Sequence, residues 1–312
     1  MLDLLPLILP LFLLIAAGYG ATFTAVFDEA AGKALSAFVF YFAIPIMLFR
    51  SVALSDPPTG EAGLLLAVFY GTMLLVLLLG AVLARRVLGA DLRDAAMLGF
   101  AGAYGNTVMI GIPVVLTVFG EAASLPMFLV ISFHSVVMFT TITLVMEASA
   151  GAGRRLRELP WQIVTGVVAN PVIIGLAAGI LVNRLGLGLP PIVDGFSALV
   201  APAAIPCALF ATGAALRRFS IRGSLPGALL AVGVKGIIHP LLLFLLCTYV
   251  FELSPLWTAV AVVLAATPVG VNPYLFAVRY RTAEGATATA IALSTPISIL
   301  TITAALWAVG VP

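Results

Sequence analysis

Runs of about twenty apolar residues recur along this 312-residue chain and constrain its fold more than any other feature. A bilayer core about 30 Å thick needs roughly 20 apolar residues for one helical crossing. The chain is 62% hydrophobic and 9% charged, whereas about a quarter of a typical soluble domain is charged. The sequence therefore predicts one all-α integral membrane domain with ten transmembrane helices. The predicted spans are residues 4–24, 33–53, 62–84, 95–119, 124–146, 162–183, 191–215, 225–250, 255–278 and 286–308.

The basic residues between these spans predict the orientation. Numbered in chain order, the even-numbered connections carry only Arg50 and Arg184. Connections rich in Lys and Arg stay in the cytoplasm, so we expect a multi-pass protein of the cell (inner or plasma) membrane with both termini on the non-cytoplasmic side. The odd-numbered connections carry 12 basic residues: Lys33, Arg85, Arg86, Arg93, Arg154, Arg155, Arg157, Arg217, Arg218, Arg222, Arg279 and Arg281.

The two halves of the chain resemble each other at an offset of 161 residues. Each half holds five predicted spans, and because five is odd, the second half must enter the membrane inverted. We expect a first repeat at 1–146, a cytoplasmic linker at 147–161 and a second, inverted repeat at 162–312. Three prolines have proline counterparts: Pro10 with Pro171, Pro45 with Pro206 and, after a one-residue gap, Pro113 with Pro273.

The fourth and ninth spans are rich in helix breakers at mid-span, over residues 105–113 and 267–273. Proline removes a backbone donor, and unpaired backbone groups persist in lipid only against protein or a cavity. We expect a half-helix to begin at Pro273 after an Asn272 cap, and another near Pro113. Two such positive helix ends favour an anion, although prolines can also merely kink packed helices. The predicted site residues of these spans are Asn106, Thr107, Gly111, Pro113, Thr267, Pro268, Gly270, Asn272 and Pro273.

These motifs, together with Ala43-Ile44-Pro45 and Ala277, resemble those of the auxin efflux carrier family. That family includes bacterial malonate and malate carriers and plant PIN-type carriers. The resemblance implies a fold shared with bile-acid sodium symporters, in which helices 4 and 9 cross at their breaks and bind substrate. It also implies a scaffold of helices 1, 2, 6 and 7, a transport domain of helices 3–5 and 8–10, a site role for Pro45 and a possible homodimer. The long cytosolic loop of many plant members is missing, so auxin is not inferred.

Two ionisable positions stand out inside the predicted spans. Lys235 lies mid-span in the eighth helix, where a charge costs roughly 2.5–3.5 kcal/mol on insertion scales, and His239 follows four residues later on the same face. Lys235 either snorkels to the headgroups or points toward the crossing, to attract an anion or to stand where relatives hold sodium. His134, in the fifth span, is either a core residue or part of the cavity wall.

These features favour a secondary transporter that moves a small organic anion of the carboxylate class by alternating access. A sodium-coupled symporter of the bile-acid type, a ligand-binding membrane sensor and a channel are the alternatives. An enzyme is not expected, because the two histidines lie far apart and no hydrolase motif is present. No cofactor, metal or nucleic-acid partner is expected; the partners are the substrate and membrane lipid. Substrate identity, direction and coupling ion stay open.

Overall fold

The computed structural model describes residues 5–54, 61–149, 169–219, 221 and 224–311. Most of the predicted linker 147–161, and the start of the predicted span 162–183, lie outside these residues. Within them the secondary structure is helical apart from one isolated bridge pair, Gly105 with Val269. The first half contains α1 (Leu5–Ala21), α2 (Glu29–Phe38), η2 (Val39–Ala43), α3 (Ile44–Ala53), α4 (Ala62–Leu88), α5 (Leu92–Ala103), η3 (Thr107–Gly111), α6 (Ile112–Phe119), η4 (Glu121–Ala123) and α7 (Ser124–Ser149). The second half contains α9 (Pro171–Arg184), α10 (Pro191–Val200), η5 (Ala201–Ala203), α11 (Ala204–Leu216), α12 (Leu225–Gly233), η6 (Val234–Ile238), α13 (His239–Leu245), η7 (Leu246–Val250), α14 (Pro255–Ala266), α15 (Asn272–Tyr280) and α16 (Glu284–Ala308).

Several of these helices are suited to a membrane. By length and composition, six helical stretches of the described chain could each cross a bilayer, and four further apolar helices have 10–17 residues. Each of these lies on one of the predicted spans, so the chain is an all-helical, multi-pass membrane protein, and the inverted ten-helix topology stays a prediction. The six long stretches are Glu29–Ala53, Ala62–Leu88, Glu121–Ser149, Pro191–Leu216, Leu225–Val250 and Glu284–Ala308.

Two of the long stretches and one of the shorter helices contain a proline one residue after a widened, π-helical turn. Pro45 follows η2, Pro113 follows η3 and Pro240 follows η6. A proline inside an α-helix lacks the donor for the preceding turn and clashes with its carbonyl, and a π-turn relieves both problems by opening the helix locally. The helices therefore continue past these prolines and do not end at them.

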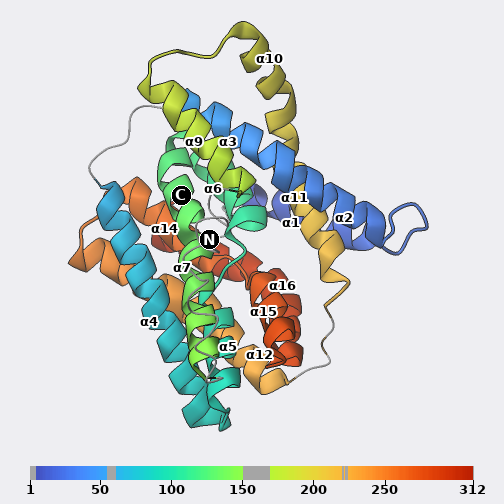
Figure 1. The fold of residues 1–312 in the computed structure, drawn as a ribbon, viewed down its shortest axis with the longest axis vertical. Helices are drawn as coiled ribbons and strands as arrows, with labels where there is room; N and C mark the ends of the chain where they lie inside the picture. Colours follow the sequence, from blue (N-terminus) through green and yellow to red (C-terminus); the bar gives the residue numbers. More distant parts are fainter. Residues whose placement is uncertain (1–4, 55–60, 150–168, 220, 222–223, 312) are drawn as a thin grey trace.

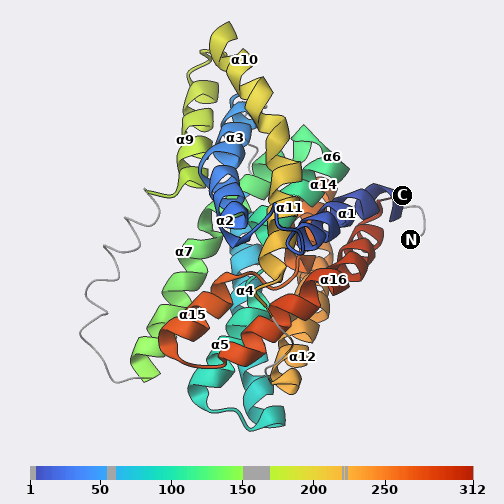
Figure 2. The ribbon, with the colours of Figure 1, turned by 90° about the vertical axis from the view of Figure 1, so that its right-hand side faces the viewer.

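The helices form two groups (Figures 1 and 2). One group contains α1, α2, α3, α9, α10 and α11, in which α1 packs on α11 and α3 packs on α9. The other contains α4, α5, α7, α12, α14, α15 and α16. The two pairings in the first group use equivalent contacts, because Gly18 lies against the carbonyl of Phe210 and Gly179 against the carbonyl of Phe49. A side chain at either glycine would collide with backbone, so both close approaches require glycine.

Polar contacts between the connecting segments also fall into two sets. The first set joins the even-numbered connections to one another: Arg50 with Asp194, Ser51 with Glu121 and Ser124, and Glu61 with Ser254. The second set joins the odd-numbered connections: Arg93 and Asp94 with Tyr280 and Thr282, Glu147 with Tyr280, Thr22 with Arg217, and Glu29 with Arg218. Connections of the same parity therefore lie together.

Candidate functional site

Two helices of the chain are broken, and their breaks lie against each other. The first break separates α5 from η3, and the second separates α14 from α15. Between the breaks, the Asn106 N–H donates to the Pro268 carbonyl at 2.8 Å and the Gly270 N–H donates to the Tyr104 carbonyl at 3.0 Å. These two bonds tie the non-helical residues 104–106 and 267–271 together, and we call this pairing the crossing.

The half-helix after the first break begins earlier than the sequence predicted. It begins at Thr107, not near Pro113, because the Asn106 side chain caps it by accepting a hydrogen bond from the Met109 N–H at 3.3 Å. Pro113 lies one turn later, after the π-turn that accommodates it. The predicted starting residue near Pro113 is therefore wrong.

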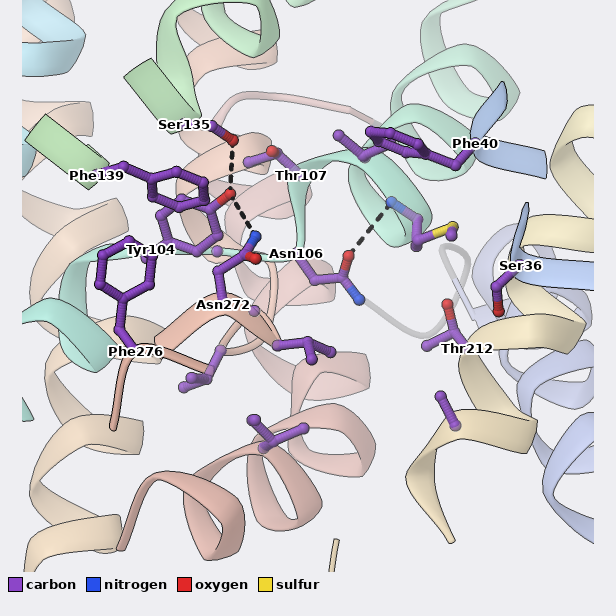
Figure 3. A pocket seen from close by; sticks show the side chains of 18 of the residues that line it. Ser36, Phe40, Tyr104, Asn106, Thr107, Ser135, Phe139, Thr212, Asn272 and Phe276 are labelled. Carbon is purple, nitrogen blue, oxygen red and sulfur yellow. Dashed lines mark hydrogen bonds between the residues drawn. The ribbon is translucent and has the colours of Figure 1, made fainter. Parts of the chain in front are cut away.

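The predicted cap of the second half-helix is also wrong. Asn272 is the first residue of α15 and caps nothing; Val271 precedes the helix. The Asn272 side-chain amide instead donates to the Tyr104 hydroxyl at 2.9 Å, and Ser135 shares that hydroxyl at 2.9 Å (Figure 3). Pro273 does occupy the first turn, as expected of a residue that needs no intrahelical acceptor. Asn272 therefore links the two broken helices to α7.

A cavity of about 620 Å³ lies on one side of the crossing. Its crossing side carries Asn106 and Asn272, one from each broken helix, and Figure 3 shows Tyr104, Phe139 and Phe276 forming an aromatic wall beside them. Its opposite side comes from the other helix group, through α2, η2, α9 and α11. The residues contributed by that group include Ser36, Phe40, Asn170, Val172, Ala211, Thr212, Ala215 and Leu216.

Four of the thirteen predicted site residues line this cavity. They are Asn106, Thr107, Gly270 and Asn272. The others lie behind the crossing or in helix packing: the hydroxyl of Thr267 donates to the Leu264 carbonyl at 2.7 Å and is fully buried. The remaining residues outside the cavity are Gly111, Pro113, Pro268, Pro273, Pro45, Lys235, His239 and His134.

Pro45 and Gly111 have packing contacts that explain their places. The Pro45 carbonyl lies against Gly175 of α9, which makes the residue part of the α3–α9 contact. Gly111 lies against Leu264 of α14, and a methyl group there would approach the leucine to 2.8 Å. Neither residue lines the cavity, and the substrate contacts predicted for them stay predictions.

The three ionisable residues singled out in the sequence are buried together. Lys235 is 1% exposed and its amine donates to the Ala265 carbonyl, so the side chain does not snorkel to the surface. The ring of His134 lies 4.5 Å from that of Tyr104 between centroids, and His239 lies 6.1 Å from Phe69. His134 thus supports the aromatic wall from behind, and Lys235 contacts the crossing from the side away from the cavity.

The cavity also contains functional candidates that sequence reasoning missed. Tyr104 directly precedes the predicted helix-breaking segment 105–113, which is a signal in the sequence that could have identified it. Ser135 and Phe139 lie one helical turn apart on α7, but their inward direction depends on how α7 meets the crossing. Arg218 and Arg279 also line the cavity, whereas in the sequence they only contribute to the predicted membrane orientation.

The charges of the cavity wall are of one sign. Its described lining includes Arg218 and Arg279 and no acidic residue. Both arginines are exposed; Arg218 lies 3.6 Å from the Glu29 carboxylate, and the Arg279 guanidinium lies 5.6 Å from the centre of the Tyr280 ring. The cavity therefore reaches the surface beside these two arginines, which lie at the odd-numbered connections.

The sequence matches the family described as "Membrane transport protein" over residues 4–307. The chain belongs to this family. This confirms the resemblance to auxin efflux carriers and gives membrane transport, not an enzymatic reaction, as the family's function. The chain is also similar to a Rhizobium meliloti (strain 1021) protein named "Putative malonate transporter", with 29% identity over 98% of this chain and 96% of the relative.

Proposed function

We propose that the chain is a secondary transporter that binds a small organic anion of the carboxylate class at the crossing and moves it by alternating access. The observation that carries this proposal is the cavity, into which both broken helices direct the start of a half-helix and an asparagine amide. The first N–H groups of a helix have no intrahelical acceptor and carry a partial positive charge. A carboxylate can accept hydrogen bonds from these groups and from the side chains of Asn106 and Asn272.

The two helix groups support an alternating-access mechanism. The cavity is lined by residues of both helix groups, and in this proposal one group is the scaffold of helices 1, 2, 6 and 7 and the other is the transport domain that carries the crossing. The reciprocal contacts of Gly18 with Phe210 and Gly179 with Phe49 support two repeats, because both members of one contact are displaced by 161 residues from those of the other. Repeats of opposite orientation can exchange conformations, which gives the carrier its two access states.

The position of the cavity supports an inward-open state. The contacts among odd-numbered connections and among even-numbered ones support ten crossings of alternating direction, and the distribution of basic residues favours both termini outside. Basic connections stay in the cytoplasm, and the cavity reaches the surface beside Arg218 and Arg279 on that side. In this arrangement the substrate enters or leaves the site from the cytoplasm.

Uptake by purified protein in liposomes tests the proposal. Radiolabelled malonate is the first probe, because the similar rhizobial protein is named "Putative malonate transporter". Other dicarboxylates, monocarboxylates, and neutral and cationic solutes complete the panel. We expect carboxylates to be transported in preference. Preferred transport of neutral or cationic solutes contradicts the anion site, and binding without any transport indicates a sensor.

Asn106→Ser is the sharpest variant for the site. Serine keeps an oxygen that can cap the half-helix but removes the amide donor that faces the cavity. We expect an uptake rate about tenfold lower with little change in thermal stability, because a hydrogen bond to a charged group contributes roughly 1.5–3 kcal/mol. Asn183→Ala is the matched control, because the Asn183 side chain donates to the Ala53 carbonyl and is not part of the cavity lining.

A further inference from the structure

Lys235 places a cationic group at the ends of two half-helices. Its amine donates to the carbonyl of Ala265, in the last turn of α14. It also lies beside Gly105, just after the end of α5: a methyl group at that glycine would be 3.0 Å from Nζ. The C-terminal end of a helix leaves carbonyl groups unpaired and carries a partial negative charge. The amine therefore lies where two negative helix ends approach each other.

Side chains supply donors to the last carbonyls of α14. The Thr267 hydroxyl donates to Leu264 at 2.7 Å, and the Thr301 hydroxyl donates to Ala266 at 3.0 Å. Lys235 donates to Ala265, the carbonyl between them. Of these three donors only the lysine can carry a charge, so it alone can neutralise the helix end.

No acidic group accompanies this amine among the described residues. The amine is buried, and its ionisable neighbours among the described residues are the two histidines, His134 and His239. The described residues also contain no group of three or more histidine, cysteine or acidic side chains that could hold a metal ion. The partner of the Lys235 ammonium is therefore backbone, not a carboxylate.

The local structure around Lys235 fits this position. The residue lies in the π-turn η6, which Pro240 at the start of α13 accounts for. At the facing position, Gly105 leaves room for the amine that any side chain would fill. Transporters with broken helices commonly bind a coupling cation with unwound carbonyls and half-helix C-termini, and those are the groups that Lys235 contacts here.

We propose that the Lys235 ammonium is a built-in cation that occupies the place of a coupling sodium ion, so that anion transport by this chain does not require sodium. The proposal rests on the proposed transport function and deepens it by assigning its coupling. It also separates the chain from the sodium-coupled symporters that share the predicted fold. The lysine acts as a positioning residue: it holds the crossing together, and the crossing holds the substrate.

The first test measures malonate uptake by wild-type protein in liposomes. Sodium is replaced on both sides by N-methyl-D-glucamine, and we expect the uptake rate to be unchanged. Uptake that rises with sodium concentration overturns the built-in cation while leaving the transport function intact. Absence of transport of every organic acid contradicts the proposed function instead, and the second test then decides about the lysine.

The second test uses the two lysines of the chain, Lys33 and Lys235. Lys235→Ala vacates the site, and we expect sodium, compared with N-methyl-D-glucamine, to raise the melting temperature of this variant only. Its sodium-free uptake should fall about tenfold, as for loss of a charged hydrogen bond. Lys33→Ala, at an exposed lysine paired with Glu29 at 2.9 Å, should behave as wild type. A Lys235→Ala protein without a sodium response, or with wild-type sodium-free uptake, overturns the proposal; if it does not fold, the sodium dependence of wild-type uptake decides.

Discussion

Gly105→Ala places a single methyl group between the two parts of the crossing. The new carbon would lie 2.9 Å from Cε and 3.0 Å from Nζ of Lys235, and it would overlap the Thr267 hydroxyl. The backbone at Gly105 is not in the left-handed region, so alanine can adopt its conformation and the effect comes from contact alone. Both neighbours are fixed by hydrogen bonds to α14, and neither can move without losing one.

The magnitude follows from these contacts. Overpacking a well-packed core costs about 1–3 kcal/mol, and displacing the amine from the Ala265 carbonyl costs roughly a further 1.5–3 kcal/mol. The expected loss of stability is therefore about 2.5–6 kcal/mol in total, together with a large loss of transport. If the lysine keeps its acceptor, only the overpacking cost of about 1–3 kcal/mol applies; the full range applies if the lysine leaves the Ala265 carbonyl.

Thermal unfolding in detergent, followed with a thiol-reactive dye, measures this effect, since Cys247 is a buried free cysteine. Gly71→Ala is the control, because a methyl group there meets nothing within 4 Å on α4, and it should be neutral or stabilise by about 0.5–1 kcal/mol. A Gly105→Ala protein that unfolds with wild-type stability and transports at the wild-type rate refutes the close contact between Lys235 and the crossing.

Three further predictions concern the cavity. Asn272→Asp places a carboxylate in its wall. With about 5 Å between this carboxylate and a carboxylate of malonate, and an effective dielectric constant near 20, the change should weaken malonate binding by about 3 kcal/mol, or roughly 100-fold. A competition assay measures this effect, and unchanged binding contradicts the anion site. Arg279→Gln should slow malonate uptake at low ionic strength and lose its effect as salt is raised; a defect that does not depend on salt points to direct contact with substrate. An inside-positive membrane potential should drive malonate uptake by about 2.3 kcal/mol per net charge per 100 mV, and a rate independent of voltage shows that another ion moves with it.

The predicted helices agree with the structure because membrane helices follow directly from apolar length. The six long stretches and four shorter helices lie on the predicted spans, and the breaks lie in the two segments that glycine and proline had marked. The exact starts of the half-helices were not predictable from proline alone. A proline such as Pro113 remains inside a helix when a π-turn precedes it. The half-helix begins instead at Thr107, directly after the Asn106 cap.

The lining of the cavity was only partly predictable for a different reason. Asn106 and Asn272 lie at the breaks, and the breaks themselves could be found in the sequence. Ser135 on α7 and Thr212 on α11 belong to helices whose apolar residues surround them on all sides, so periodicity does not indicate which face meets the cavity. Their place depends on tertiary packing between the two helix groups.

Each broken helix divides its dipole between the two sides of the crossing. The half-helices that begin at Thr107 and Asn272 direct their positive ends toward the cavity, while α5 and α14 direct their negative ends toward Lys235. One side can then receive an anion while the other already holds a cation. Because the bond pair of Asn106 with Pro268 and Gly270 with Tyr104 joins these sides, a change at Lys235 must alter the geometry offered to the substrate. Loss of the ammonium should therefore impair anion transport even though Lys235 does not line the cavity.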